Sequence, residues 1–290
     1  MSILSVKNLS KDYKDKKVLD DINLSIDEPG IWALVGPNGV GKTTFLNVMT
    51  NLLPATSGSV ELVGKSNADY TVFKEVAFLQ DNTVLFDYLT GYDHLKYVCD
   101  VQQLDKKQID EVTKYVGMDS YVKQQVGTYS LGMKQHLLLA IAIINKPKLL
   151  FLDEPLNGLD PTSAILTRKI LLELVDKGTT IILSSHNLAE IDRVTHRVIF
   201  LKDGKLIQED MSTYEKVYYH FVVSDVEKTK ELLEKHGYNV EISEKGIRVR
   251  VENQQLQSIT DVFHTANITI LDMQKEVAGS EKRYEEIFGV

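Results

Sequence analysis

Two short segments of this 290-residue chain carry side chains suited to binding and cleaving phosphate groups. The first follows the apolar run 31–35 and fits the pattern G-x-x-x-x-G-K-T, which is typical of a phosphate-binding loop. Its glycines allow backbone N–H groups to turn inward, its lysine supplies a point charge for the β and γ phosphates, and its final threonine hydroxyl is placed to bind Mg²⁺. The segment predicts a nucleoside-triphosphate site formed by Gly36, Pro37, Asn38, Gly39, Val40, Gly41, Lys42, Thr43 and Thr44.

The second segment places two carboxylates, Asp153 and Glu154, directly after the apolar run 149–152. Adjacent residues at the end of a strand point in different directions, so the two groups can do different work. Asp153 is expected to hold Mg²⁺ through its water shell, and Glu154 to polarise an attacking water. Together the two segments predict a P-loop nucleoside triphosphatase, and kinases, GTPases and helicases remain open at this point.

A third segment, Tyr-Ser-Leu-Gly-Met-Lys-Gln at 129–135, opens a predicted helix and resembles the signature sequence of ABC ATPases. Ser130 and Gly132 lie at the helix N-terminus, where a hydroxyl and free backbone N–H groups form an anion site. Leu131 and Met133 differ from the commonest form of the signature, which has glycine and glutamine there. The form found here is similar to that of bacterial exporter subunits of the bacitracin, lantibiotic and phenol-soluble modulin type.

This resemblance covers about residues 1–210 and implies roles for four more side chains. Gln80 follows a strand-like run, as the family's Q-loop glutamine does, and would reach the metal and the catalytic water. His186 resembles the switch histidine that contacts the γ-phosphate, and Asp160 ends a segment that resembles the D-loop. Tyr13 stands at the place of the aromatic side chain that stacks on adenine.

The resemblance also implies partners, because in this family the phosphate loop and the signature helix of one chain are too far apart to touch the same nucleotide. Two ATPase copies are expected to dock head to tail, with each ATP, together with Mg²⁺, held between the phosphate loop of one copy and Ser130 and Gly132 of the other. A separate transmembrane permease would receive the resulting motion. The apolar residues in the segment 81–86 either contact a coupling helix of that permease or pack a helical insert onto the core, and the sequence leaves both open.

Hydrophobic periodicity predicts the elements that position these side chains. Residues 1–212 begin with mixed β structure, continue with helical spacing over about 85–146, and then alternate strand and helix, which indicates a parallel sheet with crossover helices. Residues 213–290 have the order βαββαβα, which is that of a ferredoxin-like unit with an added helix. The fold class is therefore predicted as an α/β P-loop ABC ATPase domain, with a RecA-like core and a helical insert, followed by a small α+β accessory domain for dimer support or regulation.

Composition excludes several other classes of protein. The formal charge of −8, from 33 Lys and Arg against 41 Asp and Glu, argues against nucleic-acid binding. The longest apolar runs are far shorter than the roughly 20 residues that cross a bilayer, and the N-terminus lacks the pattern of a secretory signal. The chain is therefore expected in the cytoplasm, held peripherally on the inner face of the cell membrane through its permease. The single cysteine, Cys99, excludes an intramolecular disulfide.

The resemblance thus implies an ATP-hydrolysing subunit that powers export of a peptide or an amphipathic toxin. The alternatives are an importer ATPase, which shares the same machinery, and a soluble ABC ATPase of translation or DNA repair. Translation members usually carry two cassettes and repair members a long coiled-coil insertion, and neither is found here. A non-catalytic subunit would require a damaged set of residues, but Lys42, Asp153, Glu154 and His186 are all present.

Overall fold

The computed structural model describes residues 2–14, 16–213, 216–243, 246–251, 255–278 and 280–289. The chain divides into two compact units, Met1–Glu209 and Asp210–Val290. Each unit has its own buried hydrophobic cluster, and each is described by itself below.

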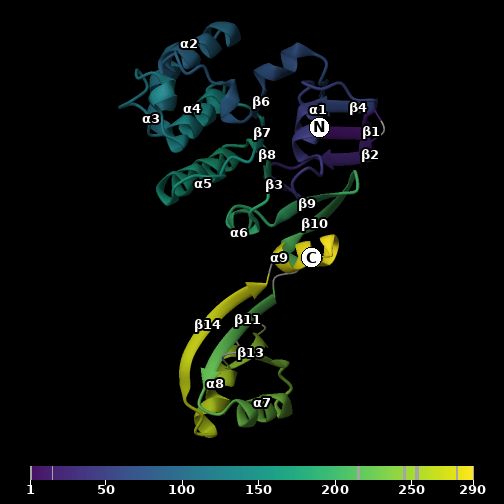
Figure 1. The fold of residues 1–290 in the computed structure, drawn as a ribbon, viewed down its shortest axis with the longest axis vertical. Coiled ribbons are helices and arrows are strands. Elements are labelled where there is room, and N and C mark those ends of the chain that lie inside the picture. Colours follow the sequence, from purple (N-terminus) through teal and green to yellow (C-terminus); the bar gives the residue numbers. More distant parts are fainter. Residues whose placement is uncertain are drawn as a thin grey trace. The chain divides into compact units, whose positions relative to one another are not determined.

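Within the described residues, the first unit contains an antiparallel sheet and a larger, largely parallel sheet (Figure 1). The antiparallel sheet has the strand order β2-β1-β4-β5, from β1 (Leu4–Tyr13), β2 (Lys16–Ile26), β4 (Ser57–Leu62) and β5 (Lys65–Ser66). The larger sheet has the order β10-β9-β3-β8-β7-β6, from β3 (Ile31–Val35), β6 (Val76–Leu79), β7 (Leu149–Asp153), β8 (Thr180–Ser185), β9 (Arg197–Lys202) and β10 (Lys205–Asp210).

The strands of the parallel sheet are apolar because they are buried. Four residues of β7, Leu149 to Leu152, are completely inaccessible to solvent, as parallel strands covered on both faces require. Helix α1 (Lys42–Met49) adds Phe45 and Leu46 to a core that also contains Leu4 of β1 and Phe151 of β7. The phosphate-loop segment therefore runs between two anchored elements, β3 and α1.

The strand β1 is longer than its hydrophobic pattern predicts. Apolar residues indicate a strand only over 3–6, but pairing with β2 continues as far as Tyr13 opposite Lys16. The second half of the strand is held by the hairpin's backbone hydrogen bonds, so its polar side chains remain at the surface.

Three helices form a group beside β6 and β7, at the positions where helical spacing is predicted. They are α2 (Gly91–Gln102), α3 (Lys107–Tyr115) and α4 (Leu131–Ile143). Thr90 and Asp93 form a capping box at the start of α2, and Ser130 caps α4. Two helices cross between later strands, α5 (Pro161–Asp176) and the single turn α6 (Leu188–Ile191). Short 3₁₀ turns lie at Tyr70–Lys74, Asn82–Val84, Val126–Thr128 and Met211–Thr213.

The second unit is a four-stranded antiparallel sheet with the order β12-β13-β11-β14. A T-shaped pair, Phe221 and Phe263 with ring centroids 5.1 Å apart, joins the sheet to a helix in its core. Within the described residues, no helix of either unit has both the length and the apolar composition of a membrane span. The elements are β11 (Lys216–Val223), α7 (Val226–Lys235), β12 (Val240–Ser243), β13 (Gly246–Val251), α8 (Gln255–Thr265), β14 (Ile270–Ala278) and α9 (Ser280–Phe288).

Candidate active site

Lys42, the first residue of α1, folds back over the loop that precedes it. Its side chain is only 7% exposed, and its Nζ donates hydrogen bonds to the carbonyl oxygens of Gly36 at 2.8 Å and of Pro37 at 3.4 Å. Gly41 has φ +117°, a conformation that favours glycine, and a Cβ at Gly36 would lie 2.9 Å from the carbonyl oxygen of Leu201. The loop therefore requires glycines where the sequence pattern has them, and it leads into the N-terminus of a helix.

Thr43 and Asp153, far apart in the chain, are in direct contact. The Thr43 hydroxyl donates to Asp153 Oδ2 at 2.7 Å. Ser184 in β8 donates to the other oxygen of Asp153, and its hydroxyl accepts a hydrogen bond from the Glu154 N–H at 3.0 Å. Asp153 and Ser184 are register partners in the parallel sheet, which explains their proximity. No sequence motif marks Ser184, because its proximity to Asp153 arises only from the register of β7 and β8.

Glu154 leaves the strand in an unusual backbone conformation. Its φ is +50°, a left-handed value that costs energy for a residue with a side chain and is often found at functional sites. One carboxylate oxygen lies 2.9 Å from His186 Nδ1, and the other lies 3.8 Å from Lys42 Nζ. The carboxylate is about one-quarter exposed, so water can reach it. The carboxylate thus lies between two candidate phosphate-binding side chains.

A hydroxyl and a carboxylate in contact, Thr43 and Asp153, are the hard oxygen ligands that Mg²⁺ prefers. Among the described residues, no group of three or more His, Cys, Asp or Glu side chains is placed to hold a metal by itself. The donor set fits an ion that takes its remaining ligands from water and phosphate oxygens, which is the usual behaviour of Mg²⁺.

Among the described residues, no hydrogen bond or ion pair links the Gln80 or Tyr13 side chain to this cluster. Gln80 follows Leu79, the register partner of Leu152, so it lies at the same sheet edge as Asp153. None of the hydrogen bonds found among the described residues joins its side chain to the cluster. Tyr13, at the end of β1, is 43% exposed and has the Lys11 ammonium 5.1 Å from its ring centroid.

The residues of the signature segment lie against the start of α5. Ser130 caps α4 by accepting a hydrogen bond from the Met133 N–H at 3.3 Å. A Cβ on Gly132 would lie 2.9 Å from Ser163 Oγ and 3.3 Å from Asp160 Oδ2. Asp160 is itself the cap of α5, and hydrogen bonds from the Ser163 hydroxyl and backbone N–H hold the pKa of its carboxyl below the ordinary value.

Leu131, which departs from the common signature, has a definite contact. Its Cδ2 lies 2.8 Å from the position that a Cβ on Gly158 would take, and Gly158 has φ +70°. Gln135, one turn further along α4, donates to the carbonyl oxygen of Pro155 at 2.9 Å. The beginning of α4 therefore packs against the segment that directly follows Glu154.

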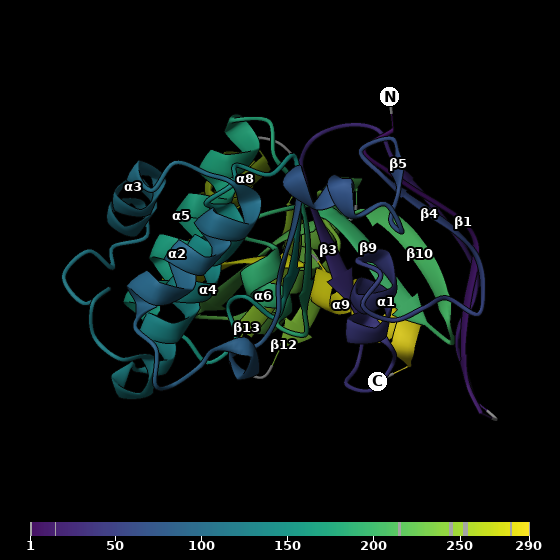
Figure 2. The same cartoon turned by 90° about the horizontal axis from the view of Figure 1, so that it is seen from above.

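The two parts of the predicted site lie in different regions of the first unit. Figure 1 shows α1, with the phosphate loop, and α4, with the signature segment, on opposite sides of strands β6 to β8, and Figure 2 also shows them apart. Lys42, Thr43, Asp153, Glu154 and His186 gather at the first part, while Ser130 and Gly132 are at the second.

The fold and this cluster define a nucleoside triphosphatase of the P-loop class. Comparison with known proteins narrows the class. The family model described as ABC transporter matches residues 19–157. The chain belongs to the ABC transporter ATP-binding family, and it is an ATPase subunit of a transporter.

Relatives and solved structures agree with this placement. The chain is 31% identical to the uncharacterized ABC transporter ATP-binding protein YhcH of Bacillus subtilis. It is also 31% identical to the bacitracin transport ATP-binding protein BcrA of Bacillus licheniformis. Each match spans 99% of this chain and 96% of the relative. It is 36% identical to the lantibiotic transport ATP-binding protein SrtF of Streptococcus pyogenes, over 71% of this chain and 90% of that protein. A solved structure of an ABC transporter ATP-binding subunit superposes with a TM-score of 0.67, at 27% identity, over 73% of this chain and 91% of the other.

Proposed function

We propose that this chain hydrolyses ATP with Mg²⁺ to power export of a peptide or amphipathic toxin through a separate membrane permease. The observation that carries the proposal is the similarity, over nearly the whole chain, to proteins named for bacitracin transport. The signature form with Leu131 and Met133 supports the same assignment.

In the proposed reaction, each residue of the cluster acts at a stated atom. Lys42 Nζ binds phosphate oxygens, and Thr43 and Asp153 are the protein ligands of Mg²⁺, which supplies charge neutralisation when bound. Glu154 accepts a proton from the attacking water, and His186 orients that carboxylate and contacts the transferred phosphoryl group. Gln80 reaches the same edge from β6, and Tyr13 stacks on the base.

A second copy of the chain completes the proposed site. Ser130 and Leu131 are exposed at the N-terminus of α4, so the hydroxyl and the backbone N–H groups there can reach a phosphate held by another molecule. Because α1 and α4 lie apart, two chains docked head to tail would form two composite sites. The D-loop residue Asp160 would lie at the contact between the copies.

A groove beside the helical group is the proposed permease-docking surface. It has a volume of about 500 Å³, and its lining includes Phe73, Phe78 and Ile141 together with Gln80. In the neighbouring segment 81–86, Phe86 is 54% exposed whereas Leu85 is 8% exposed. We therefore assign one role to each residue: Leu85 packs the helical insert onto the core, and Phe86 is exposed for contact with the permease.

The C-terminal part, residues 213–290, is proposed as a ferredoxin-like accessory domain following an ATPase domain of residues 1–212. The strand order β12-β13-β11-β14 and the alternation of strands and helices support this assignment. Its proposed role is dimer support or regulation. The assembly is proposed to lie at the cytoplasmic face of the cell membrane.

The export proposal is tested in cells that lack the chain. We expect these cells to retain a labelled amphipathic peptide of the bacitracin or lantibiotic kind, and re-expression of the wild-type chain to restore its release. The matched control is Glu154→Gln, which is expected to bind the permease without restoring release. Equal release with and without the chain would contradict export.

A further inference from the structure

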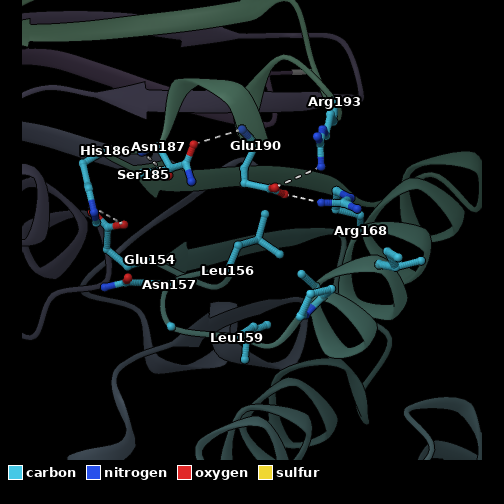
Figure 3. A pocket seen from close by; sticks show the side chains of 14 residues that line it. Glu154, Leu156, Asn157, Leu159, Arg168, Ser185, His186, Asn187, Glu190 and Arg193 are labelled. Carbon is cyan, nitrogen blue, oxygen red and sulfur yellow. Dashed lines mark hydrogen bonds and ion pairs between the residues drawn. The ribbon is translucent and has the colours of Figure 1, made fainter.

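The cavity that contains Glu154 and His186 is bounded on its other side by a cluster of charged residues. The cavity has a volume of about 380 Å³ and lies between β8, α5 and the segment after Glu154. Figure 3 shows Arg168, Glu190 and Arg193 joined by dashed lines on one side, with the His186 and Glu154 pair on the other. None of these three residues belongs to a motif recognised in the sequence.

Arg168 and Glu190 form an ion pair between two different helices. Arg168 is on α5, Glu190 is on α6, and their side chains are only 15% and 20% exposed. The carboxylate of Glu190 also accepts a hydrogen bond from Arg193 at 3.2 Å, but Arg193 is 59% exposed and only three residues away along the chain. Of these two ion pairs, the Arg168 pair is the one that joins α6 to α5.

The turn α6 begins two residues after His186 and has little stability of its own. It contains four residues, Leu188–Ile191, and an isolated single turn does not persist in water. Asn187, next to His186, accepts a hydrogen bond from the Glu190 N–H at 3.3 Å, and its own N–H donates to Ser185 Oγ at 3.0 Å. A chain of contacts thus runs from Arg168 through Glu190 and Asn187 to the backbone beside His186.

We propose that Arg168 is a positioning residue that holds α6, and with it His186, at the distance needed to contact Glu154. The proposal rests on the hydrolytic role proposed above for Glu154 and His186. Arg168 Nη1 bonds Glu190, Asn187 caps the turn, and His186 Nδ1 remains 2.9 Å from Glu154 Oε2. Arg168 itself need touch neither nucleotide nor water.

Loss of this ion pair would move the histidine without unfolding the domain. Without Arg168, the Glu190 carboxylate keeps Arg193 and solvent as partners, so α6 loses its ion pair to α5 and the segment between His186 and the buried Ile191 can shift. The phosphate loop, Thr43 and Asp153 are on other elements and keep their contacts. Nucleotide binding should persist while turnover falls, because displacement of a reacting group by about 1 Å can cost roughly 100-fold in rate.

The test compares full-length wild-type chain with Arg168→Ala, Arg168→Lys and Arg193→Ala by ATPase kinetics, binding of a fluorescent ATP analogue and thermal unfolding. We expect Arg168→Ala to lower kcat by about 10-fold or more, with analogue affinity within twofold of wild type. Arg168→Lys, which keeps the charge, should recover most of the turnover, and Arg193→Ala should match wild type.

Wild-type kcat in Arg168→Ala would overturn the proposal. So would parallel loss of kcat, affinity and thermal stability that Arg168→Lys does not recover, because that result describes a purely structural residue. If Arg168→Ala does not fold, Glu190→Gln takes its place with the same expected split between kcat and affinity. An inactive wild-type chain would instead contradict the proposed hydrolytic function.

Discussion

Replacing Lys42 with alanine should weaken ATP binding by an amount that the loop geometry allows to be estimated. The Lys42 ammonium is nearly buried and points at loop carbonyls, so it is already ordered before any phosphate arrives. A charge-assisted hydrogen bond contributes about 1.5–3 kcal/mol, which corresponds to roughly 10- to 150-fold in affinity. Because the Lys42 side chain is already ordered, the entropy cost of ordering it should offset little of this binding free energy.

The assay is thermal unfolding with and without Mg-ATP, supported by direct titration. At ATP 100 times above its dissociation constant, wild-type chain gains about 2.7 kcal/mol of stability, whereas a variant that binds 100-fold more weakly gains only about 0.4 kcal/mol. The matched control is Lys169→Ala, which removes an exposed lysine that is paired with Glu173 on α5. Its ATP-induced stabilisation should equal that of wild type.

Unchanged ATP affinity in Lys42→Ala would refute the phosphate-cradle interpretation. A lower melting temperature without ATP would not, because the alanine leaves the carbonyls of Gly36 and Pro37 without their lysine donor. The comparison therefore uses the difference between the melting temperatures with and without ATP for each variant.

Three further predictions follow from individual contacts. Gly158→Ala should destabilise the chain by about 1–2 kcal/mol, because alanine is disfavoured at φ +70°. In chemical denaturation, adding Leu131→Ala should restore only a small part of the lost stability. Full recovery in the double variant would mean that the Leu131 contact, not the backbone, sets the cost. Burial lowers the pKa of His136 despite a weaker opposing effect of the Asp160 charge, so just below the ordinary pKa of 6.5 the unfolded chain binds more protons than the folded chain. The free energy of unfolding should therefore decrease as the pH is lowered through that window, more steeply than in His136→Gln, and identical pH slopes would contradict the assignment. Phe86→Glu should abolish crosslinking to the permease while leaving ATPase activity and stability unchanged, whereas Leu85→Glu should destabilise the chain; equal effects of the two would refute the division between surface and core.

Local patterns predicted the parts of the site that are continuous in sequence. The apolar run 149–152, with Asp153 directly after it, identified the strand β7, and the glycines and lysine of the phosphate loop identified the turn into α1. These features follow from hydrophobic period and turn chemistry, which are properties of neighbouring residues.

Contacts between distant segments could not be predicted in this way. Ser184 reaches Asp153 only because β7 and β8 are parallel in a particular register. The Arg168–Glu190 pair depends on how α5 packs beside a single turn that carries no periodic signal of its own. The sequence marked Leu131 as unusual, but its neighbour, Gly158, could be identified only from the packing of α4 on the segment after Glu154.

The central claim is that Glu154 activates the water that attacks ATP, and Glu154→Gln tests it most directly. This variant keeps the shape of the side chain but removes its ability to accept a proton. We expect ATP affinity close to that of wild type and a fall in turnover of about 100-fold or more, with an ATP-bound dimer accumulating in size-exclusion chromatography. Near-normal hydrolysis by Glu154→Gln would contradict the account.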